Sequence, residues 1–377
     1  MSEFRMPSLG SDIEAGTLVK WYVKPGDKVQ RGNIVAVVET QKGAIEIEIF
    51  QDGTIDEIMV NTGQEVPVGT VLALLHGEGE EAPAEAPANV TVPAMEPARA
   101  TAKAAAPARQ QVSPAARRRA EEMGIELAAG VGTGAGGAVT LADIEKAATA
   151  KPAAAPGVEE MRRVIAAAMS RSKREIPHYY LSHTIDFTPA LDWLREANRE
   201  RSVTERMVYA VLLVKALALA LGKAPELNGF YREGRFEAQP AAHVGVAISL
   251  RRGGLVAPAL HHVADKDLDT LMGEFHDLVT RARAGRLRSS EMAGGTITIT
   301  NLGEQGVETV FPVIYPPQVA MVGFGTVTER PWVVDGGVAP RKVITATLAA
   351  DHRVSDGHRG ALFLAEVDKL LQEPDKL

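Results

Sequence analysis

Hydrophobic and polar positions in the first 76 residues repeat at a constant offset. The segment from Gly16 to Val38 matches the segment from Gly53 to Leu75, 37 positions later. Apolar residues alternate with other residues over 34–38 and again over 45–49, which predicts two strands that meet at a turn. We therefore expect two half-domains that fold alike, with Lys42 on the tip of the hairpin between them.

The pattern after residue 157 is different, because amphipathic stretches with helical spacing alternate with short apolar, β-rich runs. The helical stretches lie near residues 159–171, 189–200, 205–221, 267–284 and 359–371. The β-rich runs cover residues 244–250, 255–260, 296–300, 319–324 and 343–349. This alternation predicts a mixed α/β domain.

Two stretches rich in Ala and Pro separate these regions. They lack the large apolar residues that offset the entropy of ordering a chain, so we expect linkers at 77–111 and 148–157. The island between them, 112–147, carries helix signals near 117–123 and after Thr140. The expected organisation is a module over 1–76, a linker, a small helical domain, a second linker and a large domain over 158–377.

Composition narrows the chemistry and the surroundings. The 377 residues include no cysteine, so a thiol that takes part in a reaction must come from a cofactor or a substrate. The net charge of −7 disfavours nucleic-acid binding, and the first 76 residues carry 11 acidic against 6 basic side chains. No apolar run is long enough to span a membrane and the N-terminus shows no leader pattern, so we expect a cytoplasmic protein with no membrane partner.

Several motifs occur in one order along the chain, namely VVETQKGAIEIE, SPAARRRAEEMGI with GTGAGGAVTLADIEKA, GGLVAPAL, GGTITITNLG and DHRVSDG. In these motifs and in its organisation, nearly the whole chain resembles the dihydrolipoamide acyltransferases of 2-oxo acid dehydrogenase complexes. The resemblance implies an all-β lipoyl barrel-sandwich domain and a small α-helical subunit-binding domain. It implies a mixed α/β acyltransferase domain that resembles chloramphenicol acetyltransferase.

For Lys42, the alternative to a cofactor site is an ordinary solvated lysine. The repeat and the resemblance favour covalent attachment of lipoate at Lys42. Biotin carriers share this fold, but their lysine usually lies between two methionines, whereas Gln41 and Gly43 flank Lys42. In the resembled family the small helical domain binds partner enzymes through basic residues, and Arg117 and Arg118 match the first basic cluster. The partners implied are the 2-oxo acid decarboxylase/dehydrogenase component and dihydrolipoamide dehydrogenase.

Two other patterns favour ordinary structural roles. Residues 132–137 satisfy the dinucleotide pattern GxGxxG, but no apolar strand precedes them, so a loop between two short helices is the better interpretation. His261 and His262 suggest a metal site, but adjacent residues on a strand point to opposite faces. We therefore predict neither a dinucleotide site nor a metal site.

His352 follows an apolar strand and precedes a turn, a position where side chains commonly face a cleft. The alternative to a catalytic role is a structural histidine in a polar turn. The resemblance assigns His352 as the base that takes a proton from the thiol of coenzyme A. It places Thr300 where the family usually has serine, as the hydroxyl that stabilises the oxyanion. Asp356 is expected to orient the loop or a partner arginine.

The resemblance further implies a homotrimer, or a larger core, with active sites between subunits. The predicted function is transfer of an acyl group from lipoyl-Lys42 to coenzyme A. Acetyl is our first choice, and succinyl and branched-chain acyl groups stay open. The alternative function is a lipoyl-bearing scaffold that binds partners without catalysis, which loss of the histidine would mark; His352 is present.

Overall fold

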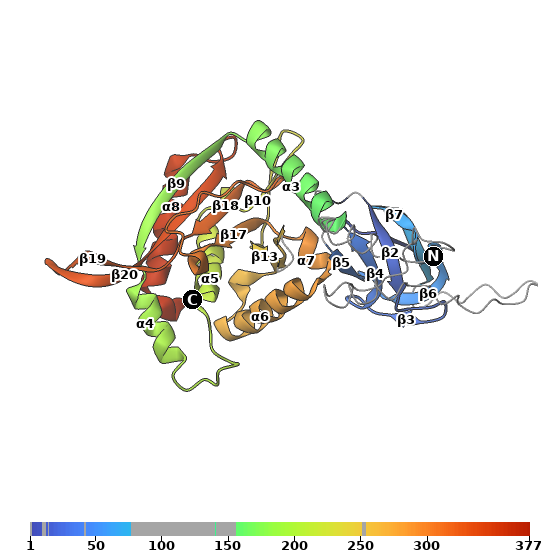
Figure 1. Cartoon of the computed structure of the whole chain (residues 1–377), viewed down its shortest axis with the longest axis horizontal. Helices are drawn as coiled ribbons and strands as arrows, with labels where there is room; N and C mark the ends of the chain where they lie inside the picture. Colours follow the sequence, from blue (N-terminus) through green and yellow to red (C-terminus); the bar gives the residue numbers. More distant parts are fainter. Residues whose placement is uncertain are drawn as a thin grey trace, which may run out of the picture. The chain divides into compact units, whose positions relative to one another are not determined.

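The computed structural model describes residues 2–9, 13, 15–40, 43–76, 140, 156–250 and 254–377. Met1–Glu80 and Gly157–Leu377 cluster into one compact unit. This unit contains two main hydrophobic cores, one in an N-terminal module (residues 2–76) and one in a C-terminal domain (residues 156–377). Figure 1 shows the strands of the first in blue and the elements of the second in green to red. No helix in the described ranges combines the length and apolar character needed to cross a membrane.

The N-terminal module is a sandwich of two antiparallel sheets. Its strands are β1 (Ser2–Arg5), β2 (Ala15–Trp21), β3 (Lys28–Val29), β4 (Ile34–Thr40), β5 (Gly43–Glu48), β6 (Gly53–Ile58), β7 (Glu65–Pro67) and β8 (Val71–His76). One sheet has the order β1-β8-β6-β3, and the other contains β5-β4-β2-β7. Leu18, Val38, Ile47 and Leu72 are fully buried between the sheets. The predicted all-β fold is confirmed.

The sequence repeat is also a structural repeat. An offset of 37 residues converts β2, β3 and β4 into β6, β7 and β8, and the two sheet orders then coincide, with β1 in the place of β5. Gly26 and Gly63 occupy equivalent turns, with φ angles of 92° and 87°. The N–H of Gly26 donates to Ile55 O and that of Gly63 to Leu18 O, each at 2.7 Å, so each turn is tied to the other half. The two half-domains fold alike, as predicted.

The predicted hairpin around Lys42 is formed by β4 and β5. Their pairing extends to Thr40 opposite Gly43, and the Thr40 hydroxyl donates to Gly43 O at 3.0 Å. Gln41 and Lys42 connect the two strands in the sequence and lie outside the described residues.

The C-terminal domain is mixed α/β, as predicted. Its helices are α3 (Pro156–Glu175), α4 (Thr188–Ala197), α5 (Tyr209–Leu221), α6 (Leu268–Ala284), α7 (Ser289–Ala293) and α8 (Gly357–Gln372). Its strands are β9 (His178–Asp186), β10 (Gly229–Arg232), β11 (Arg235–Ala238), β12 (Val244–Val246), β13 (Ile248–Ser249), β14 (Leu255–Val256), β15 (Ala259–Leu260), β16 (Arg286–Arg288), β17 (Ile297–Asn301), β18 (Ala320–Phe324), β19 (Thr328–Val334) and β20 (Gly337–Asp351). Short 3₁₀ turns cover Pro225–Leu227, Val263–Asp265, Gly303–Gln305 and Pro374–Lys376.

One seven-stranded sheet organises this domain. Its order is β15-β12-β17-β18-β20-β19, and β9 also pairs with β20. The first half of β20 pairs with β19, and its second half lies between β18 and β9. Helix α8 packs on β9, β20 and α5, which Figure 1 shows along one side of the sheet. The C-terminal end of β20 is therefore held by β18 on one side and by β9 on the other.

Some predicted boundaries are wrong. Helix α5 begins at Tyr209 rather than at residue 205, because the Glu205 carboxylate accepts from Ser202 N (3.3 Å) and Ser202 Oγ (2.6 Å) and closes a turn there. The run 255–260 forms two strands, since Pro258 lies between them and has no N–H to donate. The run 244–250 also divides, and β13 pairs with β14 outside the main sheet.

The positive φ of Gly63 gives a stability prediction. Gly63→Ala would place a Cβ in a left-handed conformation, which costs about 1–2 kcal/mol, so the N-terminal module should lose stability. Gly273, exposed in the middle of α6, is the matched control. There the same change should stabilise the C-terminal domain by about 1 kcal/mol, because alanine favours a helix over glycine. Chemical denaturation of the two variants measures both signs, and a destabilised Gly273→Ala would contradict this account.

Candidate active site

His352 directly follows β20, at the start of a tight turn into α8. Its backbone N–H donates to Pro177 O at 3.0 Å, which ties the turn to the chain just before β9. The N–H groups of Val354 and Ser355 both donate to Asp351 O at 3.0 Å. These bonds fix the backbone on either side of His352, so its side chain leaves the sheet from a defined point.

Asp351, which is buried, and Arg353, which is exposed, hold the turn by an ion pair. The Asp351 side chain is 0% exposed, and it accepts from Arg353 Nε (2.9 Å) and Nη2 (2.6 Å) as well as from Arg353 N (2.9 Å). These hydrogen bonds raise the pKa of Arg353. The guanidinium also stacks on the Tyr231 ring, 3.9 Å from its centroid. Removal of either partner would leave a buried or unpaired charge, which makes this pair a rigid base for His352.

The imidazole of His352 makes an edge-to-face contact with the ring of Tyr179. The ring centroids of Tyr179 and His352 are 5.2 Å apart at an interplanar angle of 67°. The Tyr179 hydroxyl and Ser355 Oγ are hydrogen-bonded at 2.9 Å, and burial raises the pKa of Tyr179. His352 itself is exposed in the single chain and lines an opening together with Glu226, Ser355 and Arg359. It is therefore held from one side and open on the other.

Asp356 caps α8. Its carboxylate accepts from Arg359 N at 3.0 Å, and this bond is the main cause of its lowered pKa. An ionised carboxylate at a helix N-terminus is stabilised by the helix dipole. This geometry suits the expected role of orienting the loop, and the arginine it contacts does so through its backbone rather than its guanidinium.

Thr300 lies on β17 and faces a different cavity. This cavity has a volume of about 390 Å³ and mostly apolar walls, which include Met169, Phe230, Val313 and Met321. Thr298, two residues earlier on the same face, also lines it. An apolar cavity with a few hydroxyl groups suits an acyl chain or an aliphatic arm.

Gln318 organises the polar side of this cavity. The Thr298 hydroxyl donates to Gln318 Oε1 at 2.7 Å, and Gln318 Nε2 donates to Gly295 O at 2.8 Å. Thr298 and Gln318 are both buried, so these bonds satisfy groups that water cannot reach. Thr300 is thus the hydroxyl in this row that is left to face the cavity.

One chain does not bring His352 and Thr300 to a common point. Thr300 pairs with Gly323, which pairs with Thr347, two strands away and five residues before His352. From strand spacings, the Cα atoms of Thr300 and His352 lie roughly 20 Å apart. An acid–base group and an oxyanion donor each act within about 3 Å of the reacting atoms.

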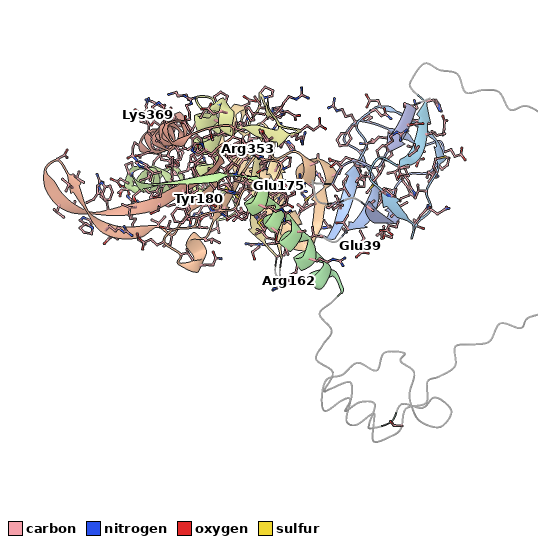
Figure 2. The ribbon with its side chains drawn as sticks, turned by 90° about the horizontal axis from the view of Figure 1, so that it is seen from above. Glu39, Arg162, Glu175, Tyr180, Arg353 and Lys369 are labelled. Carbon is pink, nitrogen blue, oxygen red and sulfur yellow. The ribbon has the colours of Figure 1, made fainter. Side chains whose placement is uncertain are left out.

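A third opening lies between the two sites. It has a volume of about 400 Å³, and it shares Arg353 with the His352 opening and Gln318 with the Thr300 cavity. Glu175, at the end of α3, also lines it together with Arg353, and both residues are labelled in Figure 2. Its charged walls separate the apolar cavity from the histidine within one chain.

The histidine pair predicted to be structural does not lie on a strand. His261 and His262 follow β15, and both rings contact His243, with centroid distances of 4.8 and 4.7 Å. The argument from opposite strand faces was therefore wrong. No group of three or more His, Asp or Glu side chains among the described residues is arranged to hold a metal ion.

Tyr179 and Gln318 are site residues that the sequence did not reveal. Tyr179 lies on β9, whose sequence HYYLSHTID does not alternate clearly between apolar and polar residues, so the strand itself was missed. Gln318 follows two prolines outside any motif. Arg117 and Arg118, and the glycines of residues 132–137, lie outside the described residues.

A family model described as "2-oxoacid dehydrogenases acyltransferase (catalytic domain)" matches residues 152–377. A model described as "Biotin-requiring enzyme" matches residues 2–75, and one described as "e3 binding domain" matches residues 111–145. The chain belongs to the 2-oxo acid dehydrogenase acyltransferase family. This acyltransferase transfers an acyl group to coenzyme A, and lipoate is its covalent cofactor.

Two relatives align with nearly the entire acyltransferase. The dihydrolipoyllysine-residue acetyltransferase component of the pyruvate dehydrogenase complex of Zymomonas mobilis is 32% identical over 432 residues, covering 99% of this chain and 98% of the relative. The acetyltransferase component of the acetoin cleaving system of Bacillus subtilis is 34% identical over 391 residues, with coverages of 99% and 98%.

Solved structures match the C-terminal domain. A probable dihydrolipoamide acetyltransferase of Listeria monocytogenes is 27% identical with a TM-score of 0.53, covering 56% of this chain and 91% of that one. The dihydrolipoamide acetyltransferase of Azotobacter vinelandii is 27% identical with a TM-score of 0.54, covering 58% and 90%. In that enzyme, a serine, a histidine 52 positions later and an asparagine four positions after the histidine have been investigated for roles in the catalytic mechanism.

The β4–β5 hairpin fits a lipoate carrier. Gly43 has a φ of 113°, and a Cβ built on it meets nothing within 4 Å, so the backbone beside the Lys42 position is open. Lysine offers the amine to which lipoate is attached through an amide. The hairpin, closed at Thr40 and Gly43, would hold that attachment point away from the core.

The histidine cluster around His243 gives a pH prediction. Burial, and then repulsion from His261 and His262, lower the pKa of His243 to about 4. The unfolded chain takes up this proton near pH 6.5 and the folded domain only near pH 4, so stability should fall as pH decreases across this window, by about 1 kcal/mol per pH unit. His243→Gln should flatten this dependence, because it removes the titrating ring and keeps an acceptor for His262 N.

Urea unfolding of the C-terminal domain at pH 6.5, 5.5 and 4.5 measures the effect. His276→Gln, on the exposed face of α6, is the matched control and should keep the wild-type dependence. Equal slopes for wild type and His243→Gln would show that His243 is not the group responsible.

Proposed function

We propose that this enzyme transfers an acetyl group from a lipoyl arm on Lys42 to coenzyme A, with His352 as the base and Thr300 as the oxyanion donor. The observation that carries the residue assignment is a pair of spacings. Thr300 precedes His352 by 52 positions and Asp356 follows it by four, which are the spacings of the serine, histidine and asparagine studied in the A. vinelandii enzyme. Here threonine replaces serine, which keeps the hydroxyl, and aspartate replaces asparagine.

His352 would act on the thiol of coenzyme A. A thiol has a pKa near about 8.5, so a few per cent is ionised at neutral pH and a base increases the attacking fraction. The imidazole accepts this proton at a ring nitrogen and later returns it to the sulfur that leaves. The lipoyl group, when bound, supplies the thioester that carries the acyl group. General base catalysis of this kind contributes about 10²- to 10⁴-fold in rate.

Thr300 would stabilise the negative charge that develops on the carbonyl oxygen. Its hydroxyl faces the apolar cavity, where low polarity strengthens a hydrogen bond to an anion. A single donor of this kind is worth about 3–4 kcal/mol. Met169, Phe230, Val313 and Met321 would exclude water from the reacting carbonyl.

The separation of His352 and Thr300 supports a site shared between subunits. The exposed face of His352 would meet the Thr300 cavity of a neighbouring copy, which a trimer with cyclic symmetry provides three times. The proposal includes such a trimeric core and a location in the cytoplasm. Its partners would be the decarboxylase/dehydrogenase component and dihydrolipoamide dehydrogenase, the second held by residues 111–145 with Arg117 and Arg118.

Acetyl is preferred over other acyl groups because both relatives named above are acetyltransferase components. The assignment is tested by measuring the rate of acyl transfer from acetyl, succinyl and isobutyryl coenzyme A to dihydrolipoamide. The acetyl group should be transferred fastest.

Single and mixed variants test the shared site. His352→Ala should reduce transfer about 10²- to 10⁴-fold and Thr300→Ala about 10²- to 10³-fold, whereas Thr300→Ser should stay close to wild type. When the two inactive variants are co-assembled in equal amounts, roughly a quarter of interfaces combine an intact His352 with an intact Thr300, so about a quarter of the activity should return. No recovery after co-assembly, with trimers formed, would contradict a site shared between subunits.

Intact mass tests the carrier residue. Protein from a lipoate-replete host should carry one lipoyl group, and Lys42→Arg should carry none, since arginine keeps the charge but offers no amine for the amide bond. Lys24→Arg, a change of the same kind on the same module, should remain lipoylated. A lipoyl group retained on Lys42→Arg would move the attachment to another lysine.

A further inference from the structure

The N-terminal module and the C-terminal domain share a strand pairing. β16 pairs in parallel with β5, with Arg286 opposite Ala44, Leu287 opposite Ile45 and Arg288 opposite Glu46. β16 belongs to no other sheet in the described ranges, and β5 is the edge of its own four-stranded sheet. The module thus extends its sheet with a strand of the domain, which is the pattern of recognition by strand addition.

A buried carboxylate lies at the end of this pairing. Glu48 is 7% exposed and Ser289 is 1% exposed. The Glu48 carboxylate accepts from the hydroxyl and the backbone N–H of Ser290, and Glu48 N donates to Ser289 Oγ at 3.2 Å. A buried carboxylate is costly unless it is hydrogen-bonded. Ser289 and Ser290 together therefore form a polar seat for Glu48, meaning a set of hydrogen-bonding partners that satisfies this one acidic residue of the module.

An apolar contact joins the two cores beside this seat. Met292, on α7, packs against the core of the module and also against the core of the domain. Ile45 and Leu287, which face each other in the pairing, are 2% and 5% exposed. The interface therefore combines backbone pairing, a specific polar contact and apolar burial.

This interface continues into the acyl-transfer cavity. Met292 and Ala293 of α7 line the cavity that contains Thr300, and so does Ser8 of the module. Ala44, the first residue of the strand pairing, is two positions after Lys42 in the sequence. Helix α7 thus contributes both to the surface that contacts β5 and to the walls around Thr300.

We propose that the C-terminal domain has a docking site for its own lipoyl module, formed by β16 and α7, which receives β5 and seats Glu48 on Ser290. The proposal rests on the proposed function, because it assigns how the carrier presents Lys42 to the Thr300 cavity. Three residues of pairing make a small interface, so we expect docking to be reversible. The carrier is recognised as a folded module as well as tethered.

A disulfide test checks the docked geometry without any catalysis. The chain has no cysteine, so Ala44→Cys with Arg286→Cys introduces one pair into an otherwise thiol-free protein. Register partners on adjacent strands have Cα atoms about 5 Å apart, which suits a disulfide. The full chain, produced without lipoate, should form this bond within one chain at least about tenfold faster than the control pair Glu57→Cys with Arg286→Cys, since Glu57 lies on the other sheet. Equal rates, or bonds only between chains, would overturn docking within the chain.

A kinetic test separates docking from chemistry. Ser290→Glu places a second carboxylate against Glu48, and it should slow single-turnover transfer from the acetylated full chain to coenzyme A about tenfold, the size of effect expected for a buried hydrogen bond to a charge. Transfer from free acetyl-dihydrolipoamide should not change. Adding Glu48→Lys to Ser290→Glu should return transfer from the acetylated full chain to its original rate. If Ser290→Glu lowers both reactions equally, or neither, the docking proposal fails. Loss of both reactions in His352→Ala tests the proposed function independently.

Discussion

The spacing of strands in one sheet is the constraint on which the proposed function of this protein depends. β17, β18 and β20 lie side by side, and their registers leave Thr300 in the middle of the sheet and His352 beyond its end. A hydrogen-bonded sheet with buried helices on it does not bend by the roughly 20 Å that would bring these residues together. Acyl transfer between two thiols needs a base and an oxyanion donor at one carbon atom. If His352 and Thr300 both act, as we propose, they must come from different subunits.

The structure orders each half of the proposed site separately. On one half, the ion pair of the buried Asp351 with Arg353, together with the Tyr179 ring, holds the turn that carries His352. On the other half, Gln318 accepts a hydrogen bond from the hydroxyl of Thr298, whereas Thr300 faces the cavity. Neither arrangement requires the other half to form. In the proposed assembly, each subunit would bring its part of the site already ordered, which would reduce the entropy cost of assembling the site.

The sequence predicted those parts of the molecule in which a local pattern repeats or a motif is continuous. The 37-residue offset predicted two like half-domains because turns such as those at Gly26 and Gly63 need the same residue at the same place. The DHRVSDG motif predicted the turn at His352 because the ion pair and the helix cap of that turn are local contacts. β9 was missed since its side chains are mostly half-buried and show no clear alternation. Tyr179, Gln318 and the contact of Glu48 with Ser290 depend on residues far apart in the chain, which no local pattern reveals.

A structure of the assembled enzyme with coenzyme A bound tests this account most directly. We expect the thiol to lie within hydrogen-bond distance of the His352 imidazole of one subunit, with the Thr300 hydroxyl of its neighbour about 3 Å from the position of the thioester oxygen. A thiol bound next to neither residue, or a site in which both residues come from one subunit, would contradict the central claim.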